Sequence, residues 1–187
     1  MKALKKIGVI GAGQMGNGIA HVCALAGYDV KLNDISEDRI KAGLATINGN
    51  MQRQVAKALI SESDRQAALS RIVPAAAYKD LTDCDLVIES ASEKEDIKKK
   101  IFGELSQLMP KEALLASNTS SISITRLGAS TDRPEKFIGI HFMNPVPLME
   151  LVELVRGIAT DDETFETSKE FVNRLQKTYA VAEDFPA

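Results

Sequence analysis

The sequence contains no tryptophan and only two cysteines and two histidines among its 187 residues. Cys23 and Cys84 lie far apart and match no metal-ligand spacing, so we expect reduced thiols and no metal site. With a net charge of −3, the chain offers no broad basic surface. This charge balance makes nucleic acids and anionic membranes poor candidates for the main partner.

Long hydrophobic runs are missing as well. The first residues, MKALKKIGVIGAGQMG, place lysines before apolar residues as a signal peptide does, but Gly11 ends the apolar run after Ile10. A signal peptide needs an apolar stretch of about 7–15 residues, and a membrane-spanning helix needs about 18. The apolar runs of this sequence are shorter, so we expect a soluble, unprocessed protein of the cytoplasm.

What the sequence does contain is an alternation of short β-rich runs and longer helical patterns, over a length that suits one domain, residues 1–187. Strands are expected over 6–10, 29–33, 71–74, 86–89, 114–117, 137–141, 150–155 and 179–182. Helices are expected over 15–26, 37–57, 63–69, 97–109, 122–128 and 162–177. This order predicts an α/β fold with a doubly wound, mainly parallel sheet and helices on both faces.

A glycine-rich turn joins the first expected strand to the first expected helix. In IGVIGAGQMG, Gly11 permits a tight turn, Gly13 lets the backbone approach a pyrophosphate, and Gly16 lets the helix pack closely on the strand. Asp34 directly follows the second expected strand, and its distance from Gly11 is near the spacing of about 20 residues typical of the acid that binds ribose hydroxyls. Because a carboxylate repels a 2′-phosphate, this Rossmann-type pattern favours NAD over NADP. The alternative is a glycine turn with a solvated aspartate.

His141 stands at the carboxyl end of the expected strand 137–141, the edge at which open α/β sheets bind ligands. Its imidazole can take or give a proton at neutral pH, although a lone strand-end histidine is more often structural. Glu153 lies in the next expected strand, and a turn at 145–147 can bring the two strands side by side. A carboxylate there would fix the ring's tautomer and raise its basicity. The alternative for Glu153 is a solvent-facing position, with Glu150 as its competitor.

A second polar cluster, SNTSS at 117–121, follows the expected strand 114–117. Serine and threonine are favoured at helix N-caps, so the plain interpretation is a loop followed by a cap. The functional interpretation is a set of hydroxyl and amide donors for a substrate oxygen or for nicotinamide.

Four segments together give the chain a family resemblance: GAGQMGNGIA, DLVIESASE, SNTSSISI and HFMNPVPLMELVE. In this order, and over essentially the whole chain, they resemble the L-3-hydroxyacyl-CoA dehydrogenases, which include bacterial 3-hydroxybutyryl-CoA dehydrogenases. SNTSS followed by HF-x-NP is far more specific than the glycine loop. The resemblance implies that the 3-hydroxyl of an acyl-CoA is oxidised to a ketone and that hydride passes to NAD.

The resemblance also implies roles for individual residues. By motif, His141 matches the general base, Glu153 the carboxylate that orients it, and Ser120 a contact of substrate and cofactor. Lys57 matches a CoA contact, for which a solvated helix-end lysine is the alternative. The implied cofactor contacts are Gly11, Gly13, Gln14, Met15, Gly16, Asp34, Glu93, Lys98, Ser120 and Asn144.

In this family a helical C-terminal domain closes over the substrate, supplies a catalytic asparagine and mediates dimerisation. The chain ends at EDFPA, where we expect the linker to such a domain. The resemblance therefore implies an NAD-binding domain with little turnover by itself and a homodimer for the full-length form. Two alternatives stay open: another Rossmann dehydrogenase acting on a sugar acid or β-hydroxyacid, and a non-catalytic NAD-binding protein like the lens crystallins that resemble this family.

Overall fold

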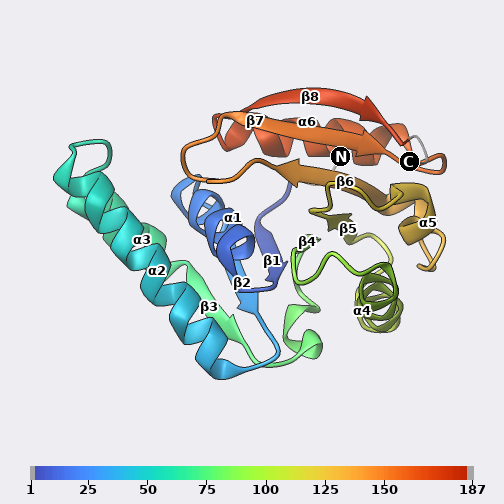
Figure 1. Ribbon diagram of the computed structural model, residues 1–187, viewed down its shortest axis with the longest axis horizontal. Coiled ribbons are helices and arrows are strands. Elements are labelled where there is room, and N and C mark those ends of the chain that lie inside the picture. Colours follow the sequence, from blue (N-terminus) through green and yellow to red (C-terminus); the bar gives the residue numbers. More distant parts are fainter. Residues whose placement is uncertain (1–2, 185–187) are drawn as a thin grey trace.

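The computed structural model describes residues 3–184, so the linker expected at Pro186 lies outside the described residues. Within them, eight strands form one sheet in the order β3-β2-β1-β4-β5-β6-β7-β8 (Figure 1). The strands are β1 Lys6–Ile10, β2 Asp29–Asn33, β3 Ile72–Ala75, β4 Leu86–Glu89, β5 Leu114–Ser117, β6 Phe137–Phe142, β7 Leu151–Arg156 and β8 Thr178–Glu183. Neighbouring strands are parallel except for β6 and β7, which are antiparallel. The expected doubly wound, mainly parallel sheet is confirmed.

The helices fall where the apolar periodicity placed them, with ends within three residues of expectation. They are α1 Gln14–Leu25, α2 Glu37–Ala56, α3 Glu62–Ser70, α4 Glu95–Leu108, α5 Ile124–Gly128 and α6 Asp162–Arg174. The largest error was at α6, which ends before residue 177 because Gln176 has a φ of 58° and cannot continue the helix. Two single-turn 3₁₀ helices, Tyr78–Leu81 and Pro134–Lys136, were not predicted, since one turn is too short to show a period.

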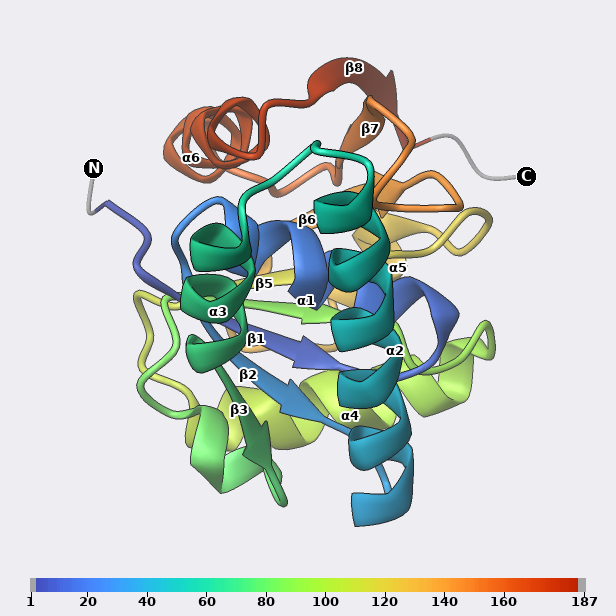
Figure 2. The same ribbon diagram turned by 90° about the vertical axis from the view of Figure 1, so that its left-hand side faces the viewer.

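Two apolar clusters cover the two faces of the sheet. One face packs against α1, α2, α3 and α6, and buries Ile19, Ile47 and Phe171. The other packs against α4 and α5, and buries Phe102 and Leu127. Figure 2 shows α1 and α4 on opposite sides of the strands. No helix in the described part of the chain is long and apolar enough to cross a membrane.

The strand order creates a topological switch point between β1 and β4, at the carboxyl ends of the strands. From β1 the chain moves outward through β2 to β3, and it then returns to pair β4 against the other side of β1. The segments that follow β1 and β4 therefore lead to helices on opposite faces of the sheet, and this topological switch point is where open α/β sheets bind ligands. Two backbone bonds mark this edge: Ser90 N donates to Ile10 O at 2.7 Å, and Gly11 N donates to Asn33 O at 2.8 Å.

Candidate functional site

The glycine loop has the close packing and the open space that its sequence predicted. Gly11 has a φ of +98°, and a Cβ at Gly16 would lie 1.6 Å from the carbonyl oxygen of Gly11. A Cβ at Gly13, in contrast, would meet nothing within 4 Å. Gly13 is also the N-cap of α1, where no side chain caps the helix and no acid lies in the first turn. The first N–H groups of α1 are therefore suited to an anion.

Asp34 lies beside this loop, directly after β2. Its Oδ2 accepts from Ala12 N at 2.7 Å, and its Oδ1 accepts from Ile35 N at 2.7 Å. Each carboxylate oxygen has a second lone pair, so the group can still receive hydroxyl donors. The structure thus places the predicted ribose-binding acid against the glycine loop, where it also fixes the loop's backbone.

Gln14 and Asn144 connect the glycine loop to the loop after β6. Gln14 Nε2 donates to Asn144 Oδ1 at 3.1 Å across 130 positions of sequence. Both residues were expected cofactor contacts, and the structure brings them together. Met15, which was also expected there, packs partly buried against the apolar cluster under α1.

His141 and Glu153 are direct partners across the antiparallel β6–β7 pair. His141 Nδ1 lies 2.7 Å from Glu153 Oε2, and the two side chains are 20% and 39% exposed. Because a carboxylate can only accept a hydrogen bond, Nδ1 carries the proton in this contact. Nε2 of a neutral ring is then the basic nitrogen. The predicted pairing of these strands is correct, and Glu153 rather than Glu150 faces the histidine.

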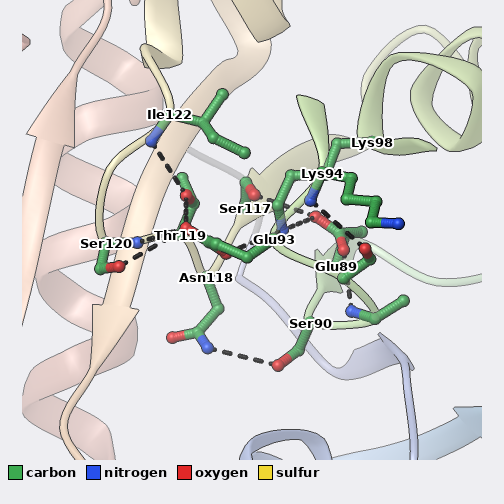
Figure 3. Close-up of polar contacts among 12 residues, drawn as sticks. Glu89, Ser90, Glu93, Lys94, Lys98, Ser117, Asn118, Thr119, Ser120 and Ile122 are labelled. Atoms are coloured by element: carbon green, nitrogen blue, oxygen red, sulfur yellow. Dashed lines mark hydrogen bonds and ion pairs between the residues drawn. The ribbon is translucent and has the colours of Figure 1, made fainter. Parts of the chain in front are cut away.

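Glu93 is the centre of the SNTSS cluster (Figure 3). Its Oε1 accepts from Thr119 Oγ1, from Ser120 N at 3.1 Å and from Ser121 Oγ at 3.2 Å. Ser120 Oγ lies 3.5 Å from the same oxygen. Burial alone would raise the pKa of Glu93, but the Thr119 hydroxyl, the Lys98 charge and the Ser120 amide together hold it below its ordinary value.

Lys98, an expected cofactor contact, is 1% exposed and forms an ion pair with a residue that the sequence did not single out. Its Nζ donates to Glu89 Oε2 at 2.6 Å and lies 3.9 Å from Glu93 Oε2. Glu89 ends β4 and is fully buried. The signal available was its place as the last residue of the apolar strand LVIE, where an acid is unusual unless it has a partner.

Asn118 is a second residue whose role the sequence did not reveal. Its Oδ1 accepts from Phe142 N at 2.8 Å, and its Nδ2 donates to Ser90 Oγ at 3.2 Å. The side chain therefore joins the carboxyl ends of β4, β5 and β6. Because Asn118 bonds the residue next to His141, it ties the Ser120 loop to the histidine strand.

Lys57 is not brought to these residues. It is the exposed C-cap of α2 at the α2–α3 turn. Figure 1 shows this turn at one end of the molecule's long axis, away from β6.

Fold and site together define a Rossmann-type dinucleotide-binding domain with an acid–base pair at the same sheet edge. The family described as "3-hydroxyacyl-CoA dehydrogenase, NAD binding domain" matches residues 6–185. The chain is 70% identical over 184 residues to a 3-hydroxybutyryl-CoA dehydrogenase of Bradyrhizobium diazoefficiens, with 98% of this chain and 63% of the relative covered. A probable 3-hydroxybutyryl-CoA dehydrogenase of Bacillus subtilis is 39% identical over 183 residues, with 98% and 64% covered.

Solved structures agree with this assignment. The crystal structure of (S)-3-hydroxybutyryl-CoA dehydrogenase from Ralstonia eutropha superposes with a TM-score of 0.96 at 42% identity, with 98% of this chain and 65% of that chain covered. The chain thus spans 63–65% of the length of these three relatives. It belongs to the 3-hydroxyacyl-CoA dehydrogenase family, as its NAD-binding domain, and NAD is its cofactor.

The residues present fit this cofactor. Gly13 leaves open space at the uncapped start of α1, which suits a pyrophosphate, and the Asp34 carboxylate beside it suits ribose hydroxyls. Gln14, Asn144 and Glu93 offer polar groups along the same edge of the sheet.

Proposed function

We propose that the chain is the NAD-binding part of a cytoplasmic enzyme that oxidises L-3-hydroxyacyl-CoA, with 3-hydroxybutyryl-CoA as the substrate, to 3-oxoacyl-CoA. The observation that carries this proposal is the 2.7 Å contact between His141 Nδ1 and Glu153 Oε2 at the carboxyl end of β6. The relatives named 3-hydroxybutyryl-CoA dehydrogenases support the substrate class. The partner is an acyl-CoA rather than a nucleic acid or a membrane, and the family resemblance supports a homodimer.

His141 is the general base in this proposal. Glu153 accepts the Nδ1 proton and so fixes the tautomer in which Nε2 has a free lone pair. Nε2 takes the proton of the C3 hydroxyl as the C3–H bond breaks, and the resulting imidazolium is stabilised by the carboxylate that already contacts its other nitrogen. NAD, when bound, supplies the hydride acceptor.

Ser120 holds the substrate oxygen in this proposal. Its backbone N donates to Glu93 Oε1 at 3.1 Å. Its hydroxyl lies 3.5 Å from the same oxygen, a long and weak hydrogen bond that a bond to a substrate oxygen can replace. The Asn118 link to Phe142 N keeps this loop in register with His141. The described residues thus supply a base, its orienting acid and a hydroxyl donor.

A substrate comparison tests the proposal. The chain, joined to the remaining part of the Bradyrhizobium relative, is assayed for NADH formation with L-3-hydroxybutyryl-CoA, its D-enantiomer and free L-3-hydroxybutyrate. We expect turnover with the first and little with the other two. Preference for the free acid would instead support a β-hydroxyacid dehydrogenase. NADH binding without turnover of any substrate would support a non-catalytic protein.

A further inference from the structure

Glu89 and Lys98 form a fully buried ion pair at the centre of the site's supporting structure. Lys98 Nζ donates to Glu89 Oε2 at 2.6 Å, and the two side chains are 1% and 0% exposed. Ser117 Oγ donates to the same oxygen at 3.0 Å, and Ala91 N donates to Oε1 at 2.8 Å. The carboxylate of Glu89 therefore has three donors, drawn from α4, from β5 and from the turn after β4.

Such a pair is not explained by stability alone. Removing two charges from water is costly, and a well-packed apolar pair of similar volume is often as stable or more stable. Buried ion pairs that fix a particular arrangement have a clearer role. This pair lies at the switch point, and the turn that Glu89 holds packs against the glycine loop: a Cβ at Gly11 would lie 2.6 Å from Ser90 O.

Lys98 stands between two carboxylates that do different things. One is Glu89 at 2.6 Å, and the other is Glu93, whose Oε2 lies 3.9 Å away. The opposite oxygen of Glu93, Oε1, accepts from the Ser120 amide and from the Thr119 and Ser121 hydroxyls. Figure 3 shows Glu93 between the SNTSS loop and the Lys98 ammonium. Glu93 thus lies within ion-pair distance of Lys98 through one oxygen and is held by the SNTSS loop through the other.

We propose that Glu89 is a positioning residue for the cofactor site: it holds Lys98 in close contact, which leaves Glu93 with the SNTSS loop and keeps Ser120 in place. The inference rests on the proposed function and extends it to a residue that touches neither cofactor nor substrate. Without the Glu89 carboxylate, the buried ammonium of Lys98 would have Glu93 as its nearest anion and would draw it away from Thr119 and Ser120.

The test is a titration of NADH against the chain and five variants, with thermal unfolding measured for each. Glu89→Gln keeps the shape of the side chain and an acceptor for Ala91 N, but it removes the charge. We expect it to bind NADH about tenfold more weakly, a change within the range of couplings typical of residues in one ion-pair network. Lys98→Met alone removes the attracting cation, and because Lys98 is itself an expected cofactor contact, this variant is the reference for the double variant Glu89→Gln with Lys98→Met. We expect the added Glu89→Gln to weaken NADH binding by less than about threefold relative to Lys98→Met alone.

Lys99→Met is the matched control. Lys99 lies on the same helix but pairs with Glu95 at the surface, where the two side chains are 40% and 29% exposed. It should leave NADH affinity unchanged. Glu89→Asp retains the charge but moves it away from Lys98 by the length of one methylene, so we expect NADH affinity to fall by about threefold. This variant provides the test if Glu89→Gln does not fold.

Three outcomes overturn the inference. They are equal affinity in Glu89→Gln and the unchanged chain, a further loss of about tenfold when Glu89→Gln is added to Lys98→Met, and, if Glu89→Gln does not fold, equal affinity in Glu89→Asp and the unchanged chain. A purely structural pair would lower the unfolding temperature without moving the affinity of the folded molecules. Failure of the unchanged chain to bind NADH would refute the proposed function together with this inference, so the two failures are distinguishable.

Discussion

Two glycines of the same loop are expected to respond in opposite ways to an added side chain. At Gly16 a Cβ would lie 1.6 Å from Gly11 O, a contact that real Cβ atoms essentially never make below 3.0 Å, so backbone must move by about 1.4 Å. Alanine is favoured over glycine in a helix by about 1 kcal/mol, but overpacking costs about 1–3 kcal/mol or more. The two nearest atoms, the carbonyl oxygen and carbon of Gly11, belong to the backbone, so no change of side-chain rotamer can relieve the overlap. We expect Gly16→Ala to lose about 2 kcal/mol of folding free energy, or about 4–8 °C in unfolding temperature.

Gly13→Ser is the contrasting variant. Gly13 has φ −66° and ψ −169°, which any residue adopts, and a Cβ there would meet nothing within 4 Å. Serine is also a favoured N-cap, so the unfolding temperature should stay the same or rise. The new side chain occupies the space through which a pyrophosphate would approach the backbone. NADH affinity should therefore fall by about tenfold or more.

Circular dichroism melts and NADH fluorescence titrations separate the two effects. Gly16→Ala should lower the unfolding temperature, whereas Gly13→Ser should lower only the NADH affinity. Unchanged NADH affinity in Gly13→Ser would show that the cofactor does not use this loop. An unchanged melting temperature in Gly16→Ala would refute the packing argument.

Two further predictions concern groups outside the site. Burial raises the pKa of the Cys84 thiol to about 12 and that of the Cys23 thiol further. Both free thiols should therefore resist iodoacetamide at pH 8 until the protein is unfolded, as mass spectrometry of the intact chain would show. Rapid labelling of the native protein would contradict their buried placement. Hydrogen bonds from Lys31 and Lys6 lower the pKa of Asp83 to about 2, below its ordinary value of 3.8, so its contribution is complete above about pH 4 and is lost as the pH falls toward 2. Urea unfolding of Asp83→Asn should show a smaller loss of stability between about pH 4 and pH 2 than the unchanged chain shows. An identical pH dependence in the two proteins would count against the lowered pKa of Asp83.

The fold was accessible from the sequence because local and global signals agree. The buried strands are short, mostly apolar runs, such as Leu86–Glu89, and Gly11, with its positive φ, marks a turn that favours glycine. The order of motifs then placed His141 and Glu153 on adjacent strands, and the β6–β7 register pairs them directly.

The interior polar network was less accessible. The family resemblance implied that Lys98 contacts the cofactor, but it did not reveal that this lysine is buried against Glu89. No periodicity distinguishes a buried charge from a solvated one, because the partner that makes burial possible lies elsewhere in the chain. The same holds for Asn118, whose bonds to Ser90 and Phe142 depend on three strands meeting at one edge.

The central claim is that His141 is the general base of a 3-hydroxyacyl-CoA dehydrogenase, and one substitution tests it most directly. The chain joined to the remaining part of the Bradyrhizobium relative is compared with its His141→Gln variant for NADH formation from L-3-hydroxybutyryl-CoA and, separately, for NADH affinity. Loss of a general base should lower kcat by about a hundredfold or more, while NADH affinity stays within about twofold. Turnover by His141→Gln at the rate of the unchanged protein would contradict the account.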